Sequence, residues 1–225
     1  MSDDRKIANV HGGIVSEIDL YHNLLYHLGM SPDEKKILKF IEEIDKFKFV
    51  TRIIHMQKGN LMEDDAQHSW HLAMMVWLFS GHFDKKINLN QAIKMTLMHD
   101  LVEIYAGDTF AYDVEGRKDK KKREDKAAKK LFKMLPKNLE EEMHQLWNEY
   151  ENRVTPEAIF VQAMDKIHPM IQIHLAKGKT WREYKITSKM IWENKTYYTK
   201  SSIFAHSLLK FIFNRAKRAK YLFRG

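Results

Sequence analysis

The chain has 225 residues, of which 44% are hydrophobic and 30% are charged, and its formal net charge is +8. These values are typical of a globular protein rather than a disordered chain. No apolar run approaches the roughly 20 residues that span a bilayer, and the N-terminus MSDDRKIANV lacks the pattern of a secretory signal. We therefore expect a cytoplasmic protein without a transmembrane helix.

The sequence contains no cysteine. This excludes disulfide bonds, thiolate metal sites and cysteine nucleophiles, and it is compatible with a reducing cytoplasm. If the protein binds a metal, the ligands must therefore be nitrogen and oxygen atoms.

Only nine glycines and four prolines interrupt the chain, which favours long helices over many short strands. Residues 1–30 are expected to form an N-terminal extension, with a helix over 17–28. The next helix begins at Pro32, because apolar residues then recur at spacings of three and four. Further helices are expected over 66–83, from after Asn88 to Gly107, over 121–135, over 138–153 and over 157–177.

No repeat, linker or change in composition divides this helical region. We therefore predict an all-α fold, a compact single-domain helical bundle of residues 31–194. Thr155 and Pro156 form a cap and a first-turn proline for the helix over 157–177. Residues 195–225 are expected to form a basic helical extension that packs on the domain.

Much of the positive charge lies in two runs, RKDKKKREDKAAKK at 117–130 and the C-terminal KFIFNRAKRAKYLFRG. Such runs are usually solvated helix faces. Neither run has the interleaved aromatic residues or the motif of a dedicated nucleic-acid reader, so we expect no specific nucleic-acid binding. The C-terminal run alternates apolar and basic residues, which leaves open an amphipathic helix against a partner or a membrane surface.

Four ionisable side chains lie within apolar predicted helices: His68, His99, Asp100 and Asp165. One such residue alone is usually hydrogen-bonded or salt-bridged. Four of them on three helices indicate a metal site, because helical bundles build such sites from inward-facing ligands. Histidine and carboxylate ligands suit Mn, Fe, Co, Ni or Zn better than Ca. Three further histidines are near enough in sequence to be alternative ligands: His71, His168 and His174.

Two more carboxylates follow the His99–Asp100 pair. Glu103 projects from the same side of the predicted helix, and Asp108 follows Gly107, where the helix should end. A metal lowers the pKa of bound water, and a nearby carboxylate can take or give a proton during attack. The alternatives are an ion pair of Glu103 with Lys94 or the basic run, and a turn or helix-cap role for Asp108.

Three stretches carry a resemblance to a known family: EDDAQHSWHLAMM, MTLMHDLVEIYAGD and the segment that ends in FVQAMDKI. An isolated histidine, an adjacent His-Asp pair and a distant aspartate follow one another in this order. The pattern resembles the HD-domain superfamily of metal-dependent phosphohydrolases, in the branch of the bacterial 5′-deoxynucleotidase and its eukaryotic relatives. The likeness runs from about residue 37 to residue 192.

The resemblance implies an all-α fold, often dimeric, with one divalent metal, which would be Mn, Co, Fe, Zn or Ni. Matched residue by residue, the metal ligands would be His68, His99, Asp100 and Asp165. In the family, the glutamate and aspartate at the positions of Glu103 and Asp108 assist hydrolysis.

The resemblance also implies a phosphate-binding arginine, which corresponds to Arg52 in FVTRIIHM. In the deoxynucleotidase an aromatic residue follows this arginine and is linked to the rejection of ribonucleotides. Ile53 takes that position here, so selectivity for the deoxy sugar does not follow from the resemblance. The segment DTFAYD after the expected metal helix also differs from the deoxynucleotidase.

The expected function is the hydrolysis of a small nucleotide, most simply a (deoxy)nucleoside 5′-monophosphate, by a metal-dependent homodimer. Arg52, with a lysine from 117–122, would offset the phosphate charge. One alternative is a nucleotide pyrophosphatase or triphosphohydrolase on the same scaffold. Another, from a different class, is a basic nucleic-acid or membrane-associated module with a vestigial metal site.

Overall fold

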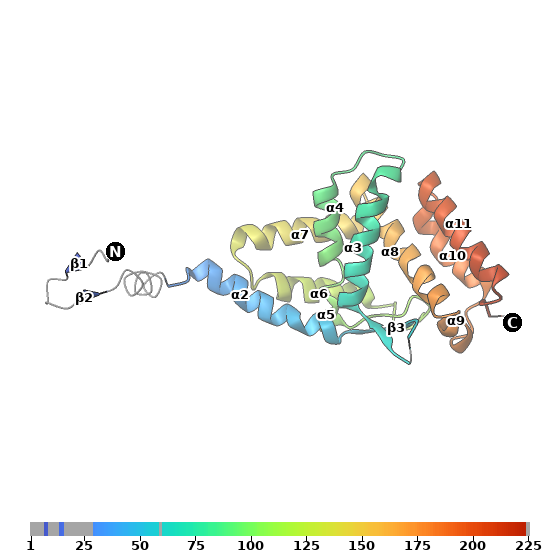
Figure 1. Cartoon of the computed structure of the whole chain (residues 1–225), viewed down its shortest axis with the longest axis horizontal. Coiled ribbons are helices and arrows are strands. Elements are labelled where there is room, and N and C mark those ends of the chain that lie inside the picture. The colour runs from blue at the N-terminus through green and yellow to red at the C-terminus, as the bar shows by residue number, and fades with distance from the viewer. Residues whose placement is uncertain (1–6, 9–13, 16–28, 59, 224–225) are drawn as a thin grey trace, which may run out of the picture.

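Long helices make up most of the described chain, as the scarcity of glycine and proline predicts. The computed structural model describes residues 7–8, 14–15, 29–58 and 60–223, and the helix predicted over 17–28 lies outside them. The prediction of an all-α fold is confirmed (Figure 1). The helices are α2 (Pro32–Ile44), α3 (Asp65–Phe79), α4 (Leu89–Met98), α5 (Glu103–Ala106), α6 (Lys120–Phe132), α7 (Lys137–Asn152), α8 (Pro156–Leu175), α9 (Lys179–Glu183), α10 (Ser188–Thr199) and α11 (Ile203–Arg218).

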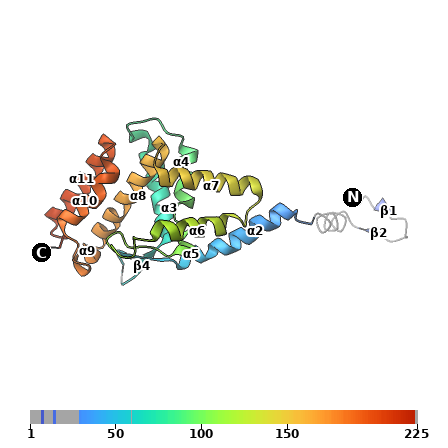
Figure 2. The same cartoon turned by 180° about the vertical axis from the view of Figure 1, so that it is seen from behind.

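Helix α8 lies at the centre of the fold. It begins at the predicted cap, where the Thr155 hydroxyl accepts a hydrogen bond from the backbone N–H of Ala158. The helix contacts α3, α4, α7, α10 and α11, and Figures 1 and 2 show it between the α10–α11 pair and the other helices. Because neighbours cover it on most sides, Val161, Met164 and Ile167 are fully buried.

The start of α3 is fixed by a capping box. The Asp64 carboxylate accepts a hydrogen bond from the backbone N–H of Gln67 at 2.8 Å, and the Gln67 side chain accepts one from the backbone N–H of Asp64 at 3.2 Å. This reciprocal pair satisfies two backbone donors that the first turn of a helix leaves free. The helix therefore starts at Asp65, and His68 follows within its first turns, completely buried.

A short antiparallel hairpin precedes α3, and the sequence analysis did not predict it. Strand β3 (Thr51–His55) pairs with β4 (Met62–Asp64). The two-residue strands β1 (Ile7–Ala8) and β2 (Ile14–Val15) also pair antiparallel. The TRIIH run contains β-branched residues that favour a strand, but it is too short for its periodicity to be distinguished from that of a helix. The hairpin matters for function because β3 carries Arg52.

The helix predicted from Asn88 to Gly107 is wrong in its middle. Asn88 does cap α4, but the helix ends at Met98, and residues 99–102 form turns before the short α5. In these turns the backbone N–H of Leu101 donates to Met98 at 3.2 Å, three residues back, where an α-helix would bond four residues back. The apolar pattern of the segment shows only that its residues are buried. Residues of a helix and residues of a turn can both be buried, so the pattern does not distinguish the two.

The basic run at 117–130 lies largely in α6, where acidic residues of the same run pair with its basic side chains. Lys120 pairs with Glu124 and Lys121 with Asp125, four residues apart on the helix. Lys121 and Asp125 lie on a solvated helix face, as expected for such a run. The expectation does not hold for the other pair, because Glu124 is buried and Lys120 is half-buried.

The C-terminal segment packs on α8 through α10 and α11. Ala205, Leu209 and Ala216 of α11 are buried, whereas the basic side chains in its last turn are exposed. The expected boundary after residue 194 falls inside α10. None of the helices in the described part of the chain is long and apolar enough to cross a membrane.

Gly178 joins α8 to α9 and should resist substitution. Its φ of +74° lies in the left-handed region, and a Cβ there would meet the carbonyl oxygen of Tyr221 at 2.3 Å. We expect Gly178→Ala to lower the free energy of unfolding by about 1–3 kcal/mol. Gly81→Ala is the control, because a Cβ at Gly81 meets no heavy atom within 4 Å. Urea unfolding of the two variants measures the difference, and an equal effect would contradict this account.

Candidate metal centre

A cavity of about 420 Å³ opens at one side of α8, between the helices and the hairpin. Its size is typical of small-molecule sites. Charged side chains line much of it, which is unusual for a ligand pocket and makes their arrangement informative. Six of the residues expected to be functional lie in this wall: Arg52, His99, Asp100, Glu103, Asp108 and Asp165. His68 lies behind the wall, completely buried.

The structure brings the four expected ligands together. Nε2 of His68 lies 3.3 Å from Oδ1 of Asp165 and 3.7 Å from Oδ2 of Asp100. Nε2 of His99 lies 3.1 Å from the same Asp100 oxygen and 4.0 Å from the same Asp165 oxygen. The two nitrogens and two oxygens come from α3, the turn after α4 and α8, so one cluster joins three segments.

The turn after α4 also fixes how His99 presents its ring. Nδ1 of His99 lies 2.7 Å from the backbone oxygen of Thr96. A carbonyl oxygen can only accept, so Nδ1 carries a proton and Nε2 is the only ring nitrogen that can offer a lone pair to a metal. That Nε2 is buried and has no hydrogen-bond partner among the described residues. This nitrogen therefore faces the carboxylates of Asp100 and Asp165 and is the one available to a metal.

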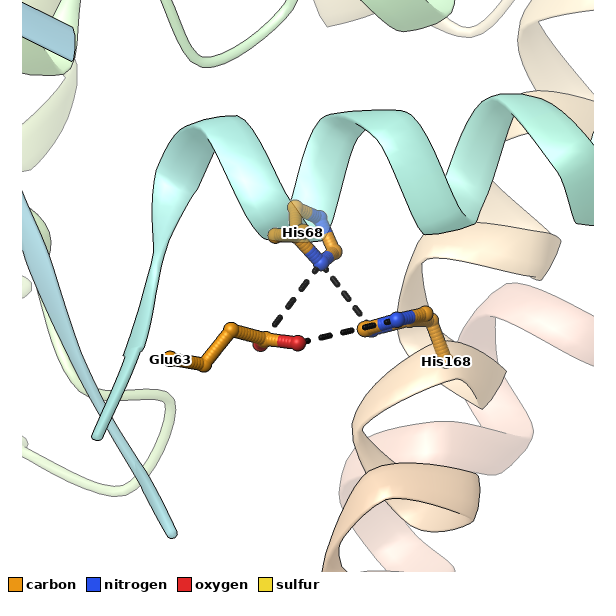
Figure 3. A group of neighbouring side chains, drawn as sticks. All are labelled: Glu63, His68 and His168. Atoms are coloured by element: carbon orange, nitrogen blue, oxygen red, sulfur yellow. Dashed lines mark hydrogen bonds and ion pairs between the residues drawn. The ribbon is translucent and has the colours of Figure 1, made fainter. Parts of the chain in front are cut away.

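Side chains perform the same task for His68 (Figure 3). Nδ1 of His68 lies 3.0 Å from Nδ1 of His168, and Nε2 of His168 lies 3.0 Å from Nδ1 of His71. The Glu63 carboxylate lies 3.9 Å from His68 Nδ1 and 3.7 Å from His168 Nε2. If His68 binds a metal through Nε2, its Nδ1 proton is donated to His168, which in turn donates to His71.

Burial, reinforced by the charge of Arg52, lowers the pKa of His68 to about 4, so this imidazole is neutral at physiological pH. Its Nε2, like that of His99, is buried without a hydrogen-bond partner among the described residues. Two orphaned ring nitrogens that face two carboxylates are costly unless a cation occupies the space between them.

Hydrogen bonds orient Asp165 toward this space. Its Oδ2 accepts from the Tyr150 hydroxyl at 3.1 Å and from the Lys166 ammonium at 2.7 Å. The other oxygen, Oδ1, faces His68 and His99. Asp165 is thus anchored through one oxygen and presents the other to the cluster.

Four carboxylates surround the guanidinium of Arg52. Its Nη1 donates to Asp65 and Asp100, both at 2.9 Å, while Glu63 lies 3.4 Å from Nε and Asp108 lies 3.9 Å from Nη1. Burial raises the pKa values of Glu63 and Asp65 to about 7. Since one positive group faces four acids, the site has a local excess of negative charge that a bound cation would offset.

Glu103 and Asp108 form a second acidic group with Asp65, in which one oxygen of each residue lies within 4.8 Å of the others. Burial, followed by the negative charges of Asp100 and Asp65, raises the pKa of Glu103 well above its usual value. The raised pKa favours the protonated form of Glu103. A buried, protonated carboxyl beside a metal cluster is suited to proton transfer.

The alternative ion pairs of Glu103 and the alternative histidine ligands differ in where the structure places them. Lys94 pairs with Glu142 at 2.6 Å instead of with Glu103. Lys120, from the basic run, does lie near Glu103, with 3.7 Å between Nζ and Oε1. Among the alternative histidine ligands, His71 and His168 lie behind His68, whereas the His174 ring packs against Tyr221.

Sequence reasoning missed three residues that support the cluster. Glu63 and Asp65 directly precede the first ligand helix, in EDDAQHSWH, where acidic residues are also expected as helix caps. Tyr150 lies in an amphipathic stretch, and only its hydroxyl bond to Asp165 distinguishes it from other core aromatics. The acidic run before His68 could have indicated Glu63 and Asp65, whereas the sequence contains no signal for the role of Tyr150.

The donor set fits a divalent transition metal. Two imidazole nitrogens and two carboxylate oxygens are available in the cluster, and Ca²⁺ would prefer oxygen ligands alone. Each imidazole has a hydrogen-bond partner at its other nitrogen, as metal-binding histidines nearly always do.

Comparison with known proteins agrees with this geometry. The sequence model of a family described as "HD domain" matches residues 44–205. A protein of Xenopus laevis named 5′-deoxynucleotidase HDDC2 is 32% identical over 140 residues, which cover 61% of this chain and 68% of that protein. A Schizosaccharomyces pombe protein named 5′-deoxynucleotidase hdd1 is 28% identical over 164 residues, which cover 71% of this chain and 81% of that protein.

Solved structures give the same result. The crystal structure of a predicted metal-dependent phosphohydrolase from Magnetospirillum magnetotacticum is 33% identical and superposes with a TM-score of 0.79, over 85% of this chain and 96% of that chain. An HD-domain phosphohydrolase from Listeria innocua, 15% identical with a TM-score of 0.60, covers 83% of this chain and 92% of that chain and supports the fold alone. The resemblance found in the sequence is confirmed: the chain belongs to the HD-domain family of metal-dependent phosphohydrolases.

Proposed function

We propose that this protein removes the phosphate from a (deoxy)nucleoside 5′-monophosphate, giving a nucleoside and inorganic phosphate. The observation that carries the proposal is the convergence of two orphaned ring nitrogens and two carboxylates at a cavity large enough for a small molecule. The relatives named 5′-deoxynucleotidase support the choice of substrate.

In this proposal His68, His99, Asp100 and Asp165 hold one divalent transition metal, which would be Mn, Co, Fe, Zn or Ni. When bound, the metal supplies Lewis-acid polarisation of the phosphate and a water of lowered pKa. The ligand type does not select among these metals, because availability competes with affinity in the cell.

Glu103 and Asp108 would manage the protons of the reaction. Because burial and neighbouring acids raise the pKa of Glu103, its protonated form is suited to protonate the leaving 5′ oxygen. Burial also raises the pKa of Asp108, although Arg52 opposes this effect. An ionised Asp108 would position the attacking water or accept its proton.

Arg52 would offset phosphate charge, but carboxylates already engage its Nη1. Its role is therefore shared between orienting Asp100 and attracting the phosphate. Ile53 lines the same cavity where the deoxynucleotidase has an aromatic residue, so we propose that ribonucleotides are accepted along with deoxynucleotides.

Three further proposals concern the whole protein. We propose a homodimer located in the cytoplasm, in which the predicted HD domain of residues 31–194 extends to the end of α10 and the segment after α10 packs on α8 as a C-terminal extension. Light scattering measures the oligomeric state directly. A nucleotide pyrophosphatase or triphosphohydrolase is the alternative enzyme. It would release pyrophosphate or triphosphate from nucleotides with longer phosphate chains, whereas the proposed enzyme releases inorganic phosphate from a monophosphate.

Asp100→Asn tests the proposed metal site and activity together. The change keeps the size of the side chain but removes a charge from the cluster. Mutations of residues that only support metal ligands lower activity by roughly 10–100-fold, so the loss of metal-dependent phosphate release in Asp100→Asn should be at least that large. The assay uses ribo- and deoxynucleoside mono-, di- and triphosphates with metal-stripped protein to which Mn, Co, Zn or Mg is added.

Asp33→Asn is the control for this experiment, because Asp33 is exposed in the first turn of α2, away from the cavity. Unchanged hydrolysis and metal content in Asp100→Asn would refute the assignment. Turnover of triphosphates without turnover of monophosphates would favour the alternative enzyme.

His168→Leu tests the support of His68. The change leaves the Nδ1 proton of His68 without an acceptor, so metal affinity should fall by about 10–100-fold. Competition with a chromophoric chelator measures the affinity without any substrate. His174→Leu on the same helix is the matched control, and an equal loss in both variants would contradict a specific role for His168.

A further inference from the structure

Lys195 of α10 is a buried cation that the proposed reaction does not use. Only 3% of the residue is exposed, and it lines the cavity that also holds the metal cluster. Lysine is almost never fully buried unless it is paired, because its ammonium loses hydration that the protein must replace. Lys195 therefore requires a compensating group.

Among the described residues, no carboxylate forms an ion pair with Lys195, and its side chain donates no hydrogen bond to another residue. The charges that act on it come mainly from other cations, Lys166, Arg52 and Arg117, and from one acid, Asp165. That acid already receives hydrogen bonds from Lys166 and Tyr150. Burial, followed by the charge of Lys166, lowers the pKa of Lys195 to about 7.

The backbone of α10 is held in place near Lys195. Arg153 donates hydrogen bonds to the backbone oxygens of Tyr197 at 3.3 Å and Tyr198 at 2.6 Å. Arg153 itself ends α7 in the left-handed conformation, with φ of 54°. This contact links the end of α7 to α10. It fixes the backbone of α10 at the cavity wall, where Lys195 lies.

An anion in the cavity would provide what Lys195 lacks. The ammonium has three donors and no acceptor, so its complement is a group with several negatively charged oxygens. Arg52 is a poor sole partner for such a group because Asp65 and Asp100 already accept from its Nη1. Other basic residues of the cavity wall are also engaged by acids, Lys120 by Glu124 and Lys166 by Asp165, whereas the buried Lys195 has no acidic partner among the described residues.

We propose that Lys195, on the wall of the cavity formed by α10, binds the phosphoryl group of the nucleotide substrate and of the phosphate product. This proposal rests on the proposed phosphohydrolase reaction and assigns to it a binding residue outside the HD motif. The site chemistry recognises a phosphate monoester dianion or inorganic phosphate.

The first test is the binding of inorganic phosphate to the metal-loaded protein, measured by titration calorimetry. Lys195→Met keeps the length of the side chain and removes the charge. We expect its phosphate affinity to fall by about 10-fold or more, since a hydrogen bond to a charged group contributes roughly 1.5–3 kcal/mol. The control is Lys189→Met on the same helix, whose side chain is 83% exposed.

The variant is expected to fold, because methionine suits a buried position and removes an unpaired charge. The melting temperature of Lys195→Met should therefore equal or exceed that of the wild-type protein. Lys195→Gln is the second variant, and it keeps a hydrogen-bond donor while losing the charge. Equal phosphate affinity in Lys189→Met and either folded Lys195 variant would overturn the proposal.

Kinetics with the nucleotide separate this proposal from the proposed function. We expect Lys195→Met to raise KM by a larger factor than it lowers kcat, because the loss of a contact made equally in the ground and transition states appears in KM. Lys195→Arg should recover part of the loss, because it restores the positive charge. If no nucleotide is hydrolysed but phosphate binding still depends on Lys195, the function is wrong and the subsite stands. Hydrolysis with an unchanged KM in Lys195→Met would leave the function intact and refute the subsite.

Discussion

A single guanidinium group holds together segments that are far apart in the sequence. Nη1 of Arg52 bonds both to Asp65 at the start of α3 and to Asp100 in the turn after α4. These bonds bring together acids that would repel one another in a buried setting, and so fix the positions from which His68 and Asp100 face the same space. The dense packing around α8 then keeps Asp165 on the remaining side.

The sequence predicts this site better than it predicts the backbone that presents it. Histidines and acids within apolar stretches mark buried polar chemistry, and their order matches a family pattern, so the cluster of His68, His99, Asp100 and Asp165 was foreseeable. The turn at 99–102 was not, because periodicity records which residues are buried and not which hydrogen bonds they make.

The burial of Lys195 also does not follow from the sequence around it. In the sequence it lies among polar residues near the start of a basic segment, where a lysine is usually solvated. Its burial is a consequence of how α10 lies against α8, and no local pattern encodes that contact. The hairpin that carries Arg52 was missed for a related reason, since pairing between short strands depends on residues outside each strand.

The position of α10 after the metal-binding elements in the sequence has a consequence for biosynthesis. All four proposed metal ligands precede Lys195 in the sequence, as does the hairpin with Arg52. Because a protein is made from its N-terminus and domains begin to fold during synthesis, these residues leave the ribosome before α10 does. The cavity therefore acquires the wall formed by α10 only after the elements that carry the metal-binding side chains have already been made.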